Sequence, residues 1–199
     1  MNTDIKPIEP IEHMEITEIS GLDEESDPDA DNVLIISNDG YICNIPKKYT
    51  YISDFLKGMY EGDSSAGKLG NEIILGKLNS VTLRLVEEYM KYHKGEDNDI
   101  PNMPLEDTSM RTVMRDNWDA DFLDRLVPSV PVDNDSDEVI PNLGGLIDLL
   151  TVSNYLGMNV LLHKLSAKFA SFLRNKGEDE ISRFLAIYSN NLNGSNNGN

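Results

Sequence analysis

The sequence has a single cysteine, few basic residues and no long hydrophobic run. The lone Cys43 excludes an internal disulfide framework and a zinc site built from several cysteines. The 17 Lys and Arg against 35 Asp and Glu give a net charge of −18, which argues against nucleic acid and anionic membrane surfaces, because both are bound by clustered cations. No apolar run approaches the roughly 18 residues of a transmembrane helix, and no signal-peptide pattern is present. We therefore expect a soluble intracellular protein, cytoplasmic, nuclear or both, with no nucleic-acid and no membrane partner.

Motifs that mark catalytic, cofactor and metal sites are missing as well. The sequence holds no GxxxxGK[ST] phosphate loop, no GxGxxG or GxSxG, no HExxH and no CxxC. Its histidines, His13, His93 and His163, lie far apart; we interpret His163 as a helix-surface residue and His93 as a favourable cation in the last turn of a helix. We interpret Cys43 as a strand side chain rather than a nucleophile. The sequence therefore predicts a protein that is not an enzyme, with no catalytic residue, no cofactor and no metal.

Polar and acidic segments divide the chain. Residues 1–32 carry eleven acids, one base and three prolines, and such a segment has too little apolar surface to offset the chain entropy lost on folding. We expect a disordered acidic leader there, with an acidic docking tail as the alternative. Residues 127–142 have the composition of an acidic linker or loop, and residues 189–199 that of a disordered tail.

The block 33–126 combines strand and helix patterns. Two β-branched runs, residues 33–37 and 41–45, flank an Asp-Gly pair, which is a strong hairpin signal. Apolar spacing predicts a helix over residues 51–60 with Phe55 on its apolar face. The run EIIL predicts a third strand over residues 72–75. Further helices are expected from Ser80, which we take as an N-cap, and over residues 118–126.

The block 143–188 has a helical pattern throughout. Its apolar spacing predicts helices over residues 143–158, 159–175 and 178–188. Gly157 suits the turn between the first two, because glycine is the residue that most often ends a helix. Strands first and helices later predict an α+β fold, with a small three-stranded sheet, a helical cluster and extra C-terminal helices.

The helix over residues 144–156 carries more apolar residues than one core face requires. Either this helix is buried on all sides, or one face packs on the core and the other binds a partner. The later helices add large apolar residues of the kind that dominate interfaces: Leu161, Phe169, Phe172, Phe184, Leu185 and Tyr188. We expect them to form an open surface for a partner.

The order of these segments resembles the BTB/POZ fold. VLIISNDGYICNIPKKY and YISDFLKGMY match its opening strand, turn, strand and helix, and EIILGKLNSVTLRLVEEYMKYHKGE matches its next strand and helix. The later NWDADFLDRL and GGLIDLLTVSNYLGMNVLLHKLSAKFASFLRNKGEDEISRFL are similar to the S-phase kinase-associated protein 1 family, the adaptor of SCF ubiquitin ligases. Elongin C is the nearest alternative, but its chain ends soon after the helix with the N-Y-L element, whereas a further helical pattern follows here.

The resemblance implies a POZ core over residues 33–126, closed by helices within residues 143–188. It also implies an adaptor that bridges a cullin-type scaffold and F-box-type substrate receptors. The matched pair Asn154 and Tyr155 would contact the cullin. The C-terminal helices would contact the F-box through Phe169, Phe172, Phe184 and Leu185.

Two departures from the family pattern leave other functions open. The segment between Leu123 and Gly144 is longer than is usual in the family, and SNNLNGSNNGN stands where the family has a terminal helix with a W-C motif. We therefore expect weaker F-box binding. One alternative is a self-associating BTB/POZ interaction protein, which a stable dimer in solution would favour. The other is a decoy that binds cullin or F-box partners without forming an active ligase.

Overall fold

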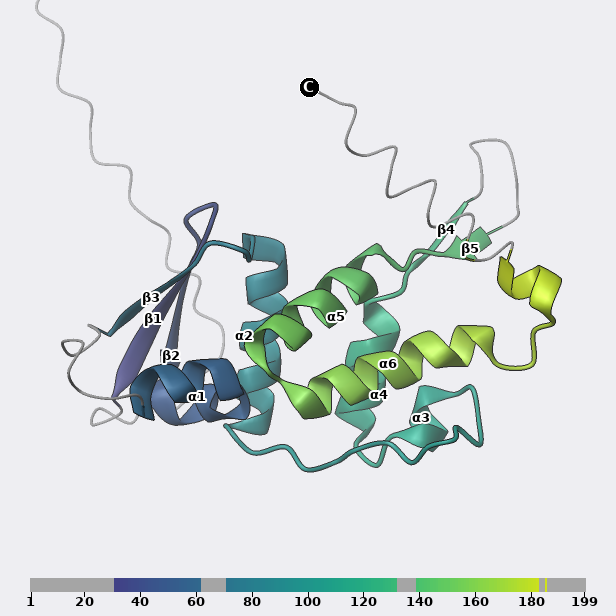
Figure 1. Ribbon diagram of the computed structural model, residues 1–199, viewed down its shortest axis with the longest axis horizontal. Helices are drawn as coiled ribbons and strands as arrows, with labels where there is room; N and C mark the ends of the chain where they lie inside the picture. Colours follow the sequence, from purple (N-terminus) through teal and green to yellow (C-terminus); the bar gives the residue numbers. More distant parts are fainter. Residues whose placement is uncertain (1–30, 62–70, 132–138, 183–184, 186–199) are drawn as a thin grey trace, which may run out of the picture. The chain divides into compact units, whose positions relative to one another are not determined.

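The computed structural model describes residues 31–61, 71–131, 139–182 and 185 (Figure 1). All of them belong to one unit, which spans Asp31–Asn199. The expected leader, apart from its last two residues, and the expected tail lie outside the described residues, so both remain predictions. Asn32, which we assigned to the leader, instead begins the first strand and pairs with Pro46.

The three-stranded sheet has the predicted hairpin and the predicted third strand. β1 (Asn32–Ser37) pairs antiparallel with β2 (Ile42–Pro46) and parallel with β3 (Glu72–Leu75), so the strand order is β2-β1-β3. Side chains alternate along each strand, and one face of the sheet is buried in the core: Val33, Ile35, Cys43, Ile45, Ile73 and Leu75. Cys43 is therefore a buried strand side chain, as predicted, and burial raises the pKa of its thiol to about 12.

The helix predicted over residues 51–60 has different bounds. Lys47–Ile52 form a 3₁₀ helix, Ser53 is extended, and α1 covers Asp54–Glu61. The Ser53 hydroxyl accepts a hydrogen bond from the Leu56 N–H at 3.2 Å, so Ser53 satisfies a donor in the first turn of α1 and separates the two helical segments.

α2 (Ser80–His93) begins one residue after its cap, which is Asn79 and not Ser80 as we predicted. The Asn79 side chain accepts a hydrogen bond from the Thr82 N–H at 2.9 Å. The helix packs against β2 and α5, and Leu83, Val86, Tyr89 and Met90 are its large buried residues. α2 thus lies between the sheet and the helices that follow (Figure 1).

The segment after α2 has little regular structure before two short helices, α3 (Met110–Val113) and α4 (Asn117–Arg125). The segment that we expected to be a linker or loop, residues 127–142, instead carries two strands at its ends. β4 (Ser129–Pro131) and β5 (Val139–Pro141) pair antiparallel, with Ser129 opposite Pro141. This small ribbon leads the chain from α4 to α5.

The predicted pair of long helices is confirmed. α5 (Gly144–Leu156) and α6 (Asn159–Leu173) pack side by side and are joined through Gly157 (Figure 1). Residues 178–182 are helical and agree with the start of the last predicted helix, while Tyr188 lies outside the described residues. Within the described residues, none of the helices has the length and hydropathy needed to cross a membrane. The architecture is α+β, as the sequence predicts.

Candidate functional site

Asn154 and Tyr155 lie in the last turn of α5, beside the start of α1. The Asn154 side chain is exposed and Tyr155 is half-buried. The Tyr155 ring packs against Phe55 of α1, with 5.2 Å between ring centroids, and the Lys77 ammonium lies 4.7 Å from the Tyr155 centroid. We call Phe55, Lys77, Asn154 and Tyr155 the α1–α5 surface.

The end of α5 is held to α1 by hydrogen bonds at their junction. The Ser53 hydroxyl donates to the Leu156 carbonyl oxygen at 2.5 Å, and the Asp54 N–H donates to the Gly157 carbonyl oxygen at 3.3 Å. Gly157 has φ +64°, and a Cβ there would lie 3.0 Å from Asp54 Cβ, so a glycine lets the two helices approach. The α1–α5 surface therefore sits on a fixed backbone.

The sequence did not predict two members of this surface. We placed Phe55 on the apolar face of its helix, yet it is 36% exposed and flanks Tyr155. Helical spacing groups Phe55 with Leu56, and only the tertiary packing separates them, because Leu56 alone enters the core. Lys77 follows β3 in a turn and carries no pattern that would have indicated it.

The second candidate surface lies on α5 and α6, and we call it the α5–α6 face. Phe169 and Phe172 of α6 are half-buried and pack against the core, and Leu185 is 44% exposed. Phe184 lies outside the described residues. Our prediction that Leu161 is an exposed partner contact is wrong, because Leu161 is 1% exposed. The remaining members are half-buried apolar residues: Ile147, Leu150, Leu162, Ala170 and Leu173.

The structure excludes one of the two interpretations of α5, burial on all sides. Its core face holds Leu146, Leu149, Val152 and Leu156, while Asp148, Thr151 and Asn154 are exposed on the other side. α5 is therefore not buried on all sides. Ile147 and Leu150 are intermediate, which leaves apolar surface at the edge of its core face.

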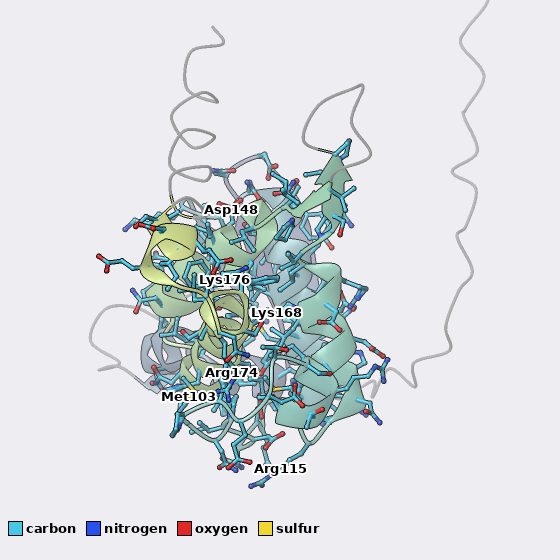
Figure 2. All side chains as sticks on the ribbon, turned by 90° about the vertical axis from the view of Figure 1, so that its right-hand side faces the viewer. Met103, Arg115, Asp148, Lys168, Arg174 and Lys176 are labelled. Carbon is cyan, nitrogen blue, oxygen red and sulfur yellow. The ribbon has the colours of Figure 1, made fainter. Side chains whose placement is uncertain are left out.

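Cations are concentrated along the second half of α6 and just after it. Figure 2 shows Lys168, Arg174 and Lys176 on one side of the protein. Lys168 Nζ lies 2.7 Å from Asp124 Oδ1 of α4, and Arg174 Nη2 donates to the Glu106 carbonyl oxygen at 3.0 Å. These contacts connect α6 to α4 and to the segment that follows α2.

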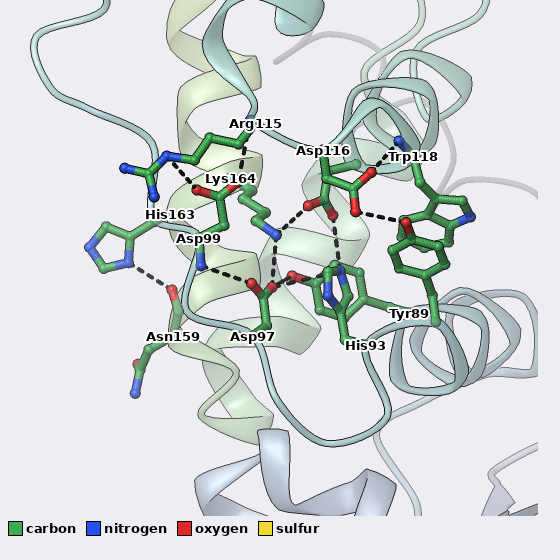
Figure 3. Close-up of polar contacts among 12 residues, drawn as sticks. Tyr89, His93, Asp97, Asp99, Arg115, Asp116, Trp118, Asn159, His163 and Lys164 are labelled. Carbon is green, nitrogen blue, oxygen red and sulfur yellow. Dashed lines mark hydrogen bonds and ion pairs between the residues drawn. The ribbon is translucent and has the colours of Figure 1, made fainter.

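A buried ionic cluster lies under α6 (Figure 3). Lys164 Nζ is 2.8 Å from Asp97 Oδ2 and 2.6 Å from Asp119 Oδ2, and the Lys164 side chain is 0% exposed. His93 Nε2 lies 3.0 Å from Asp119 Oδ1, and the Tyr89 hydroxyl donates to Asp97. His93 is thus part of this cluster, whereas His163 is exposed on α6 as predicted.

The Asp97 carboxylate is held ionised by its hydrogen-bond donors. Burial alone would raise the pKa of Asp97, but hydrogen bonds from Lys164 and Tyr89 lower it below its ordinary value. Burial and the adjacent Asp97 carboxylate raise the pKa of the Tyr89 phenol. No group of three or more His, Cys, Asp or Glu in the described part of the chain could hold a metal ion, and here the Lys164 ammonium balances the acids.

The sequence did not predict the cluster. Lys164 follows Leu161 by three residues and precedes Leu165, so its position falls on the buried face of α6. A lysine on an apolar face is the one signal in the sequence. Its two partners come from distant segments whose proximity depends on the fold.

The chain matches no model of a known protein family. It is 26% identical over 161 residues to "S-phase kinase-associated protein 1 homolog" of Tetrahymena thermophila, which covers 81% of this chain and 85% of that one. The chain is thus similar, at a divergent level of identity, to the S-phase kinase-associated protein 1 family. It is also 25% identical over 160 residues to "E3 ubiquitin ligase complex SCF subunit sconC" of Arthroderma otae, over 78% of this chain and 82% of that one.

Proposed function

We propose that the chain is an adaptor subunit of an SCF-type ubiquitin ligase, which joins a cullin-type scaffold to an F-box-type substrate receptor. The observation that carries this proposal is the similarity to named SCF subunits over about four fifths of the chain and of the relatives. We take the α+β architecture as a BTB/POZ fold with additional C-terminal helices. The chain would act by binding and would catalyse no reaction itself.

The α1–α5 surface is the proposed cullin contact. It combines an exposed amide, Asn154, with two neighbouring aromatic rings and a cation. Aromatic residues with an apolar ring and a polar end are enriched in interface hot spots. The junction of α1 and α5 fixes these side chains before a partner arrives, which reduces the entropy lost on binding.

The α5–α6 face is the proposed F-box contact. Phe169 and Phe172 belong to it, and Phe184 and Leu185 are proposed with them from the sequence alone. A row of half-buried apolar side chains on two adjacent helices suits a helical partner segment, which would insert its own apolar residues between them. Ile147 and Leu150 of α5 are likewise partly buried against the core.

The α1–α5 surface lies near the start of α6, whereas Phe169, Phe172 and Leu173 of the α5–α6 face lie in the second half of that helix. The α1–α5 surface lies beside the first residue of the helix, since Asn159 Nδ2 donates to Asp54 Oδ2 at 2.9 Å. Phe169 and Leu173 follow ten to fourteen residues later, which places them roughly 15–20 Å along the helix axis at 1.5 Å per residue. Two partners could therefore bind at once.

Replacing the Asn154-Tyr155 pair tests the cullin contact. Asn154→Ala combined with Tyr155→Ala should reduce affinity for a cullin N-terminal fragment about 30-fold or more, because a hot-spot side chain is worth about 2 kcal/mol or more. Affinity for an F-box segment should remain within about twofold, since distant sites act independently. Titration calorimetry with both partners measures the two affinities.

Asp148→Ala is the matched control, because Asp148 is exposed two turns earlier on the same helix. It should change neither affinity. Thermal unfolding of the double variant should shift by only a few degrees, since Tyr155 is half-buried. Loss of folding would contradict the assignment of Tyr155 to an interface, and failure of the unaltered chain to bind either partner would contradict the adaptor function.

A further inference from the structure

Lys164 joins three segments of the chain at one ammonium group. It lies on α6, while Asp97 belongs to the irregular segment over residues 94–109 and Asp119 to α4. Figure 3 shows the Lys164 side chain beside Asp97, and Lys164 Nζ lies 2.6 Å from Asp119 Oδ2. All three side chains are at most 2% exposed. The contact is therefore a link between elements and not a surface ion pair.

Within the cluster, nearly all oxygens of the Asp97 and Asp119 carboxylates have a hydrogen-bond or ion-pair partner. Asp119 also contacts His93, and Asp97 accepts from Tyr89 and, through Oδ1, from the Asp99 N–H at 3.0 Å. A buried ion pair is tolerated only when its remaining donors and acceptors are satisfied in this way. Rotation or sliding of α6 would bury the Lys164 ammonium away from these acids. The cluster thus allows one orientation of α6 and strongly disfavours others.

The segment over residues 94–109 is held by side-chain contacts, which include Leu105 in the core and the Lys164–Asp97 pair. It contains neither helix nor strand, so no ladder of backbone hydrogen bonds holds it in place. Besides the Lys164–Asp97 pair, its contact with α6 includes the hydrogen bond from Arg174 to the Glu106 carbonyl, which is exposed. Ile100 and Met103 of this segment are exposed. The buried pair is thus the stronger of these two connections.

We propose that Lys164 is a positioning residue for the α5–α6 face, the proposed F-box contact of the adaptor. By pairing with Asp97 and Asp119, it orients α6 and keeps the 94–109 segment against it, and so presents Phe169 and Leu173 to the F-box partner. The inference rests on the proposed function and assigns the F-box affinity, rather than the cullin affinity, to this buried group.

Lys164→Met tests the proposal, with Lys168→Met as the matched control. Both lysines lie on α6 one turn apart and both pair with an Asp of α4, but the Lys168 pair is at the surface, where its acid Asp124 is half exposed. Lys164→Met should lower F-box affinity roughly tenfold, or about 1.4 kcal/mol, while cullin affinity changes less than about twofold. Amide hydrogen exchange should become faster across residues 94–109. Lys168→Met should leave all three measurements near those of the unaltered chain.

Asp97→Ala is a second variant, for the case that Lys164→Met fails to fold. It keeps Lys164 paired with Asp119 and releases only the 94–109 segment, so exchange there should become faster and F-box affinity should fall several-fold. Equal losses of cullin and F-box affinity in this variant, or unchanged exchange in residues 94–109, would overturn the positioning role. If the unaltered chain binds neither partner, the proposed function fails, and the exchange measurement alone then supports or overturns the link made by Lys164.

Discussion

Asp39 connects the β1–β2 hairpin to the start of α2. Its Oδ2 accepts hydrogen bonds from the Ser80 N–H at 3.0 Å and the Ser80 hydroxyl at 2.7 Å, and its Oδ1 accepts one from the Ser37 hydroxyl. These hydrogen bonds, that of Ser37 foremost, lower the pKa of Asp39 to about 2. A carboxylate at the N-terminus of α2 is also favoured by the helix dipole. The exposed Asp39 side chain thus connects the β1–β2 turn to the N-terminus of α2.

The acid stability of the protein should depend on Asp39. Because its pKa is about 2 in the folded state against an ordinary 3.8, its contribution is complete above the unfolded pKa and is lost as the pH falls through 2. Asp39→Asn should therefore flatten the fall in melting temperature between about pH 5 and pH 2. Circular dichroism melts over this range measure it.

Ser80→Ala supplies a graded control for this prediction. It removes the hydroxyl donor to Asp39 but keeps the backbone N–H. The dependence of its melting temperature on pH should therefore lie between those of Asp39→Asn and the unaltered chain. Parallel profiles for Asp39→Asn and the unaltered chain would show that the hydrogen bonds do not shift the pKa of Asp39.

Individual residues differ in how far the sequence predicts them. The burial of Cys43 follows from strand alternation alone. Lys164 and Phe55 do not follow, because each depends on a neighbour that is distant in the chain: Asp97 and Asp119 for the lysine, Tyr155 for the phenylalanine. The proposed cullin contacts Asn154 and Tyr155 were indicated by resemblance, while their neighbours Phe55 and Lys77 required the fold.

At the scale of elements, Gly95 marks the point where the chain leaves α2. It has φ +91°, and a Cβ there would clash with the carbonyl oxygen of Lys48. The Lys94 residue before it ends the helix in the left-handed region, with φ 52°. Gly95 therefore lets the 94–109 segment turn closely past the 3₁₀ helix that contains Lys48.

Gly95→Ala should destabilise the fold by about 2 kcal/mol or more, because the substitution adds both backbone strain and a clash with main chain. Gly58→Ala is the control. Gly58 lies in α1 with open space around its Cα, so alanine there should stabilise by roughly 0.5–1 kcal/mol. Urea unfolding gives both values, and a neutral Gly95→Ala would show that the backbone at residue 95 moves freely.

Local patterns predicted most elements, and the exceptions have physical causes. The hairpin, β3, α5 and α6 follow from periodicities of two or about 3.6 residues. β4 and β5 are three residues each and contain Pro131 and Pro141. The prolines and acidic residues of this segment therefore indicated a loop rather than strands. The break between the 3₁₀ helix and α1 arises because Ser53 bonds to both Leu56 and the distant Leu156.

For the whole molecule, the charge bears on how copies and partners associate. A net charge of −18 makes copies of the chain repel one another at low salt. Self-association is therefore opposed, whereas a partner with a basic contact surface would be attracted. The alternative of a self-associating protein would have to overcome this repulsion through apolar contacts.

A bridging adaptor should hold both partners at once. We expect a cullin N-terminal fragment, this chain and an F-box segment to form a 1:1:1 complex, because the α1–α5 surface lies near the start of α6 and Phe169 and Leu173 lie in its second half. F-box affinity should change less than about twofold when the cullin fragment is saturating, since sites that share no contacts are nearly additive. Light scattering gives the mass of the complex, and titration with and without the cullin fragment gives the coupling.

Competition between the two partners would contradict bridging, and a dimer of the chain alone would favour the self-associating alternative. Binding of the F-box segment or the cullin fragment, but never both, would instead support a decoy.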